Sequence, residues 1–227
     1  GMLLRVPDDP KSHGATTLSG TAAVDDDMRT MRGHLTMSAS GSSILLLSSI
    51  ADAVQASRRD IYMEDILSGG SRSCHLDSLR PMHSDDGAII GIQAAYADDG
   101  AVISGAGGTK LYINVSPLRS IALPLFDLPK RRYDAKIPMT DDAAADITID
   151  IPEGYAAEYA APSEMSTRWY DLRVEYVHDN GKARCRASFK WKTPYIRRAD
   201  MDEWNKATRK ARRIMTTPLS LSRAAAQ

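Results

Sequence analysis

The sequence predicts a β-rich α+β protein, in which a sheet-plus-helix domain is followed by an antiparallel β-sandwich with a C-terminal helix. Three observations support this class. Asn180-Gly181 is the preferred centre of a two-residue hairpin turn, apolar and polar residues alternate on both sides of it, and an apolar stripe at helical spacing lies near the C-terminus. We place an extended lead-in at residues 1–16, the α+β domain at 17–122 and the sandwich at 123–227.

The composition is that of a globular protein with a core of ordinary size. Of the 227 residues, 43% are hydrophobic, and 29 Lys and Arg balance 29 Asp and Glu. The zero net charge gives no reason to expect nucleic acid or an anionic membrane surface as a partner. The longest apolar run is too short to span a bilayer, so we predict no membrane span.

The α+β domain is expected to follow a β-β-α-β-β-β order. Its first two strands enclose an acidic turn at residues 25–27, and Met31, Leu35 and Met37 share one strand face. The expected elements are strands at 17–24 and 29–40, helices within 44–54 and 61–66, and strands at 72–82, 88–97 and 111–115.

Residues 116–130 contain three prolines and are expected to form the linker between the two domains. The sandwich then begins with three short strands, at 133–137, 146–151 and 156–159. The middle strand is expected to be half-buried, because Ile147, Ile149 and Ile151 alternate with polar residues.

The register of the hairpin around Asn180-Gly181 follows from the residue types. With Asp179 and Lys182 as the closing pair, apolar residues fall on one face and opposite charges on the other. The apolar pairs are Tyr170–Trp191, Leu172–Phe189, Val174–Ala187 and Tyr176–Cys185, and the charged pairs are Asp171–Lys190 and Glu175–Arg186. A slip of one residue would exchange the two faces.

The C-terminal helix is expected to start at Asp200, which forms a capping box with Glu203. Pro218 ends the helical region, and a last strand is expected around residues 219–221. The apolar stripe of this helix consists of Met201, Trp204, Ala207, Ala211 and Ile214.

The two cysteines are the first candidates for chemistry. Cys74 and His75 are neighbours on a strand and point to opposite faces, so they cannot form a thiolate–imidazole pair with each other. We expect Cys74 and Cys185 to be core residues with free thiols, and His75 to be exposed. A long-range disulfide and a hydrolase centred on Cys74 remain as alternatives.

Other groups that resemble sites are better explained as turns and solvated surface. The acidic clusters lack the spacing of a calcium-binding loop, and the glycine-rich segment at 105–108 lacks the lysine and helix of a phosphate-binding loop. The acidic clusters lie at residues 25–27, 85–86, 98–99 and 141–142. The basic run at 130–132 is read as a solvated face. We therefore predict no catalytic, cofactor-binding or metal-binding residue.

From residue 123 onward the order of motifs resembles a known module. Leu-Pro-Leu at 123–125 precedes Lys-Arg-Arg-Tyr at 130–133, and the string Ile-Asp-Ile-Pro-Glu-Gly-Tyr occupies 149–155. The aromatic hairpin and the C-terminal helix follow. This order is similar to the C-terminal domain of unknown function that follows the transglutaminase-like core in large secreted or periplasmic bacterial proteins. The segment at 111–117 resembles the end of the region that precedes that module.

The resemblance implies a non-catalytic accessory or scaffolding region, in a periplasmic or secreted protein, that accompanies an upstream catalytic-like domain. No catalytic residue is transferred, because this chain has no Cys/His/Asp core.

The alternative is an independent carbohydrate- or protein-binding module. Its candidate surface is formed by Tyr155, Tyr159, Trp169 and Tyr195. Trp169 falls on the charged face of the hairpin, where it is either an exposed ring or covered by a second packed layer.

Overall fold

The fold was examined in a computed structural model, which describes residues 14–44, 73–85, 89–115, 118, 121, 123–138 and 141–224. The described elements are mainly strands, with one α-helix, so the β-rich α+β class is confirmed. The strands are β1 (Ala15–Val24), β2 (Met31–Ser40), β3 (Cys74–His83), β4 (Ile89–Asp98), β5 (Val102–Gly105), β6 (Lys110–Ile113), β7 (Ala135–Lys136), β8 (Asp142–Asp150), β9 (Tyr155–Ala157), β10 (Ser163–Ser166), β11 (Tyr170–Asp179), β12 (Lys182–Trp191), β13 (Tyr195–Ile196) and β14 (Leu219–Arg223). The helices are α3 (Met201–Met215) and two 3₁₀ turns, η2 (Ala106–Gly108) and η3 (Arg198–Asp200).

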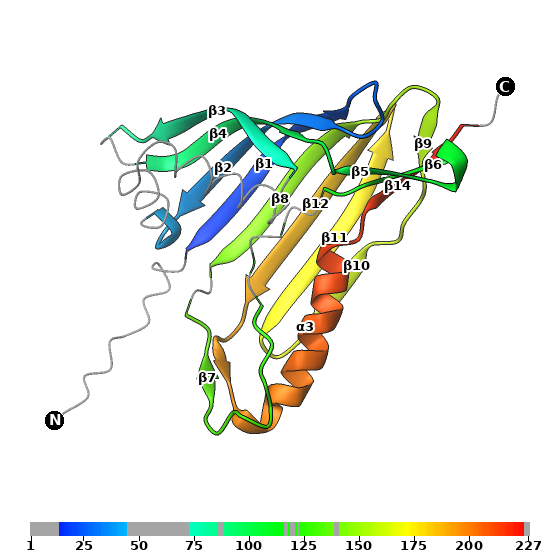
Figure 1. The fold of residues 1–227 in the computed structure, drawn as a ribbon. Helices are drawn as coiled ribbons and strands as arrows, with labels where there is room; N and C mark the ends of the chain where they lie inside the picture. Colours follow the sequence, from blue (N-terminus) through cyan, green and yellow to red (C-terminus); the bar gives the residue numbers. More distant parts are fainter. Residues whose placement is uncertain are drawn as a thin grey trace.

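An eight-stranded mixed sheet forms the main layer of the molecule (Figure 1). Its strand order is β10-β11-β12-β8-β1-β2-β4-β3. The central pair, β1 and β8, is parallel, with Ala15 opposite Asp142 and Ala23 opposite Asp150. All other neighbours in this sheet are antiparallel.

The hairpin of β11 and β12 has the predicted register. Asp179 pairs with Lys182, and Asn180 and Gly181 have positive φ values of 48° and 75°, as a type I′ turn requires. The pairs from Tyr170–Trp191 to Tyr176–Cys185 follow as expected. The apolar face of this hairpin is part of the core.

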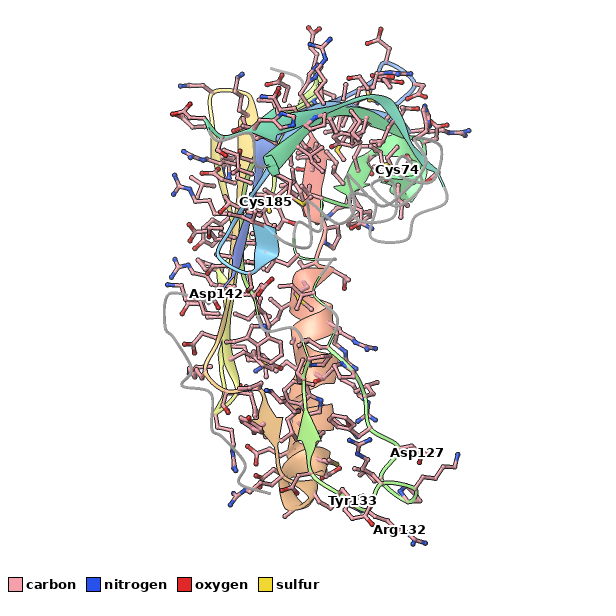
Figure 2. All side chains as sticks on the ribbon, turned by 90° about the vertical axis from the view of Figure 1, so that its left-hand side faces the viewer. Cys74, Asp127, Arg132, Tyr133, Asp142 and Cys185 are labelled. Carbon is pink, nitrogen blue, oxygen red and sulfur yellow. The ribbon has the colours of Figure 1, made fainter. Side chains whose placement is uncertain are left out.

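Two different elements cover one face of the large sheet. Helix α3 packs against β8, β11 and β12, and the four-stranded sheet β5-β6-β14-β9 packs against the other half of the same face. In Figure 2 the large sheet is seen from its edge, with α3 on one side of it. The third sheet is the two-stranded pair of β7 and β13, which lies near the start of α3 (Figure 1).

The predicted division at residue 122 does not separate two sheets. Strands from both sides of it form the one large sheet, because β8 adds to β1 on one edge and to β12 on the other. Strand β14, from the C-terminal end, likewise pairs with β6 from the first region. The expected sandwich of residues 123–227 is replaced by one sheet shared between both regions and covered by a helix and a small sheet.

Most of the expected elements are present where they lie in the described residues. Met31, Leu35 and Met37 are buried on one face of β2, and β14 is the expected last strand. The glycine-rich segment at 105–108 forms the end of β5 and the turn that leads to β6, so it is part of a hairpin, as expected. The expected helices at 61–66 and over most of 44–54, and the lead-in up to residue 13, lie outside the described residues.

The prediction of a capping box at the start of α3 is wrong. Asp200 makes no side-chain hydrogen bond to the helix backbone. Its carboxylate instead binds the guanidinium groups of Arg197 and Arg168, at 2.8 Å and 3.2 Å. These two cations lower the pKa of Asp200.

The part of the expected linker that the structure describes is a strap bound to α3. The indole nitrogen of Trp204 donates to the carbonyl of Pro124 at 2.8 Å, and Arg212 donates to the carbonyl of Leu123 at 2.7 Å. The amide of Asn205 bonds both the N–H and the carbonyl of Phe126, each at 2.9 Å. We call residues 123–131 the strap.

Candidate protein interaction surface

Trp169 is a core residue, with 1% of its surface exposed, so its proposed role as an exposed ring is wrong. It precedes β11, in a turn where the Thr167 hydroxyl accepts the N–H groups of Trp169 and Tyr170. The strand alternation therefore does not apply to it. Its ring meets Trp204 at 5.4 Å in an edge-to-face arrangement, so α3 is the second packed layer.

Tyr155 is half-buried and serves the fold. Its hydroxyl donates to the carbonyl of Gly108 at 2.7 Å, and its side chain packs against the core beneath the small sheet. This hydrogen bond ties β9 to the loop between β5 and β6.

Tyr159 and Tyr195 are exposed, with 81% and 58% of their surfaces accessible. Tyr159 follows β9 at the small sheet, whereas Tyr195 lies in β13 beside the start of α3. These two elements lie at opposite ends of the molecule (Figure 1). The four predicted rings therefore do not form one surface.

Neither cysteine forms a disulfide, and both are buried. Burial raises the pKa of Cys185 to about 12, against the smaller opposing effect of a hydrogen bond with Tyr176. Cys74 faces the core and His75 is exposed, as predicted. With a pKa of about 12, the Cys185 thiol is protonated at neutral pH and is a poor nucleophile.

A different group of exposed residues gathers where β7 and β13 meet. Tyr133 has 80% of its surface exposed, more than Tyr195, and Arg132 beside it is also exposed. Figure 2 shows Asp127, Arg132 and Tyr133 together at the end of the molecule where α3 begins. We call residues 126–137 and 193–200 the aromatic–basic tip.

The backbone of the tip is held by Arg198. Its guanidinium donates to the carbonyls of Arg131 and Leu128 at 2.6 Å and 2.9 Å, and its backbone N–H donates to Asp134 at 2.7 Å. Strand pairing between Lys136 and Tyr195 connects the two segments. These contacts therefore hold the backbone that carries the exposed rings of Tyr133 and Tyr195.

The cations of the tip outnumber its acids. It contains Lys130, Arg131, Arg132, Lys136, Arg197 and Arg198, against Asp127, Asp134 and Asp200. Asp127 binds Lys130 at 2.9 Å, and Asp134 and Asp200 have the partners given above. Among the described carboxylates, none forms an ion pair with Arg132 or Lys136. The ammonium of Lys136 lies 5.4 Å from the centre of the Tyr195 ring, and Arg131 lies 5.4 Å from that of Phe126.

This surface was not predicted as a whole, because the basic run at 130–132 was interpreted as a solvated face. Tyr133 follows the run directly, which was the available signal. Tyr195 is far away in sequence and reaches the tip only through the pairing of β13 with β7. No local pattern predicts that pairing.

No protein-family model and no curated protein sequence matches this chain. Within the described ranges, no group of three or more His, Cys, Asp or Glu residues is arranged to hold a metal ion. In the same part of the chain, no helix combines the length and apolar character needed to cross a membrane.

Proposed function

We propose that this chain is a non-catalytic accessory unit that docks an acidic protein surface through the aromatic–basic tip. The observation that carries this proposal is the pair of exposed rings, Tyr133 and Tyr195, beside cations that no described carboxylate neutralises. Tyr and Arg are among the residue types that dominate the binding energy of protein interfaces.

The frame of the tip supports binding, because it lowers the conformational entropy lost on association. Arg198 and the pairing of β7 with β13 hold the backbone on which both rings stand. A tyrosine on a fixed backbone loses only its side-chain freedom when it is covered, so more of its contact energy appears as affinity.

The charge of the tip favours an acidic partner. Its three acids already bind cations or a backbone N–H, whereas Arg132 and Lys136 remain available to a carboxylate on another molecule. Such complementarity accelerates association and selects against basic partners.

The wider context of this proposal is the resemblance to the accessory region of transglutaminase-like bacterial proteins. In that context the partner is the catalytic-like domain of the same protein, in the periplasm or outside the cell. The order of the motifs from residue 111 to the C-terminal helix supports this context. The burial of both thiols in the core is consistent with a structural role for each.

The alternative is an independent module that binds a glycan. The exposed face of Tyr133 favours it, because an aromatic ring offers an apolar face to a sugar ring as well as to a protein. A glycan would depend on the rings more than on the cations, unless it is itself acidic.

The test measures fluorescence anisotropy of a labelled peptide in which Glu alternates with Leu and Phe. We expect saturable binding that weakens about tenfold in Tyr133→Ala and in Arg132→Gln, a loss of about 1.4 kcal/mol that exceeds the cost of truncating most interface residues. Tyr159→Ala is the matched control, since Tyr159 is as exposed as Tyr133 but lies at the other end of the molecule. It should leave the affinity unchanged.

Two results would contradict the proposal. One is equal weakening by Tyr159→Ala and Tyr133→Ala, which would mean that the peptide adheres to any exposed ring. The other is tighter binding of neutral or acidic oligosaccharides than of the peptide at the same site, which would favour the glycan-binding module.

A further inference from the structure

The outer face of the large sheet, opposite α3 and the small sheet, carries two shallow hollows that differ in how their charges are paired. One has a volume of about 340 Å³ and lies over β10, β11 and β12. The other has a volume of about 420 Å³ and lies over β2, β4 and β3. We call them the paired hollow and the open hollow.

In the paired hollow, most of the charged side chains form ion pairs, and Lys190 is the exception among its described lining residues. Arg173 binds Glu164 and Glu175, at 2.5 Å and 2.6 Å, and Asp171 binds Lys192 at 2.6 Å. Ion pairs also cover the sheet between the two hollows, as between Lys182 and Asp150 at 3.0 Å. Most of this face is therefore a solvated surface with little charge left for a ligand.

The open hollow differs, because its polar side chains have no partners among the described residues. The register places His34, Ala95 and Ser78 in one row across the three strands, and Thr36, Gln93 and Arg80 in the next. Their side chains make no hydrogen bond or ion pair within the described ranges. Ala95 has a short side chain, so the longer residues around it form the walls.

The donors of the open hollow fit a phosphate group, and the geometry points to a binding site for the phosphate of a small ligand. Arg80 offers a fork of N–H donors, Gln93 an amide, and Thr36 a hydroxyl. His34 and Ser78 add donors from β2 and β3, the two strands on either side of β4. A phosphate presents oxygens in several directions at once, whereas a carboxylate presents two in one plane.

Two features of the described lining favour a small anion over a cation, a nucleobase or a sugar. The described residues that line the open hollow include no Asp or Glu, so none of them repels an anion. The same described lining contains no aromatic ring on which a nucleobase or a sugar ring could stack. Asp77, which precedes Ser78 in the chain, and Asp25 both lie within ion-pair distance of Arg32, at 3.8 Å and 2.7 Å.

The test is an NMR titration of the ¹⁵N-labelled chain with sodium phosphate, at an ionic strength held constant with sodium chloride. We expect saturable shifts at the amides of Thr36, Gln93 and Ala95, and none at Ser188 in the paired hollow. Arg80→Gln should weaken the binding at least tenfold, because it removes charged hydrogen bonds to the ligand. Lys190→Gln, in the paired hollow, is the matched control and should leave the affinity unchanged.

Two further ligands and one further variant complete the experiment. Glycerol phosphate identifies the source of the group, because tighter binding than inorganic phosphate indicates an ester and weaker binding indicates the free ion. Sodium acetate should bind at least tenfold more weakly. Arg80→Lys keeps the charge but loses the fork, and we expect an intermediate affinity.

The inference is overturned if the shifts do not saturate, or if acetate binds as tightly as phosphate. It is equally overturned if Arg80→Gln and Lys190→Gln reduce the affinity by the same factor, since that result would reflect general screening of charge. Because Arg80 is exposed, its substitution should not unfold the chain, and an unchanged thermal midpoint of Arg80→Gln would verify this.

Discussion

One face of the large sheet is covered by α3 over one half and by the small sheet over the other. The two halves are packed with different kinds of side chain. Beneath α3 the core is aromatic, and beneath the small sheet it is mainly aliphatic. The aromatic half contains Trp169, Tyr170, Phe189, Trp191 and Trp204. The other half is built on residues such as Ile147, Ile149, Leu111, Ile113, Leu219 and Leu221.

The shape of each cover explains this difference. A helix is a cylinder, which leaves wedge-shaped spaces on both sides of its line of contact with a sheet, and large rings fill them. Trp204 alone lies within 6.3 Å of four other rings, measured between ring centres. Two sheets face each other about 10 Å apart, a spacing that interdigitating Ile and Leu side chains fill.

The two halves meet within a short distance along β8. Ala145 belongs to the aromatic half, and Ile147 and Ile149 to the aliphatic half. The hydroxyl of Tyr176 crosses the same boundary and donates to the carbonyl of Thr217, in the connection between α3 and β14, at 2.8 Å. This continuity predicts that the halves unfold together.

The largest loss of stability is expected for Trp204→Ala. It removes the central ring of the aromatic half and the hydrogen bond to Pro124, so the free energy of unfolding should fall by about 4 kcal/mol. Urea unfolding followed by circular dichroism measures the change. Tyr159→Ala, an exposed control, should change this free energy by less than about 0.5 kcal/mol. A loss below about 1 kcal/mol in Trp204→Ala would mean that the rings do not hold α3.

The next effect is expected for Leu221→Ala in the aliphatic half, with a loss of about 3 kcal/mol in the free energy of unfolding. All three tryptophans belong to the aromatic half, so their fluorescence reports on that half alone. If the halves unfold as one, fluorescence and circular dichroism should give the same urea midpoint in this variant. Separate midpoints would show that each cover unfolds independently.

A smaller effect is expected for Asn205→Ala. The substitution leaves the N–H and carbonyl of Phe126 without their partner, which should cost about 2 kcal/mol in the free energy of unfolding. Hydrogen exchange at the Phe126 amide should accelerate as the strap loosens. An unchanged exchange rate would show that Trp204 and Arg212 hold the strap without Asn205.

The smallest loss of stability is expected for Asp27→Asn, in the turn between β1 and β2. Hydrogen bonds from Thr30 and Arg29 lower the pKa of Asp27 to about 2 in the folded chain, from 3.8 as the ordinary value. A lowered pKa stabilises the fold above pH 3.8, and this contribution is lost as the pH falls towards 2. The variant should therefore be slightly less stable than the parent at pH 6, and the difference should shrink as the pH falls through 2. A difference in stability that does not depend on pH would contradict this origin.

Local patterns predicted the elements and their buried faces, but not their assembly. The β11–β12 hairpin was predicted with its register, because its turn and its paired charges are all local. The pairing of β1 with β8 was not, because many strands with one apolar face could occupy that position. The assumed domain boundary followed from three prolines, of which Pro124 and Pro129 lie in the strap that α3 holds in place.

The site was predicted less well than the fold. Tyr195 was named correctly as exposed, and Trp169 was misjudged because a strand alternation was extended into a turn. Tyr133 was overlooked beside the basic run, although its neighbours were visible in the sequence. The open hollow depends on rows of residues across β2, β4 and β3, which appear only once the order of these strands is known.

The parallel pairing of β1 with β8 has a consequence for synthesis on the ribosome. Strand β1 is made just before β2 and can pair with it at once, but its other edge stays open until β8 has emerged. Throughout that interval the nascent chain exposes a strand edge of the kind that recruits foreign strands. The completion of the sheet is therefore coupled to the progress of translation, and a pause before residue 142 would prolong the period of greatest aggregation risk.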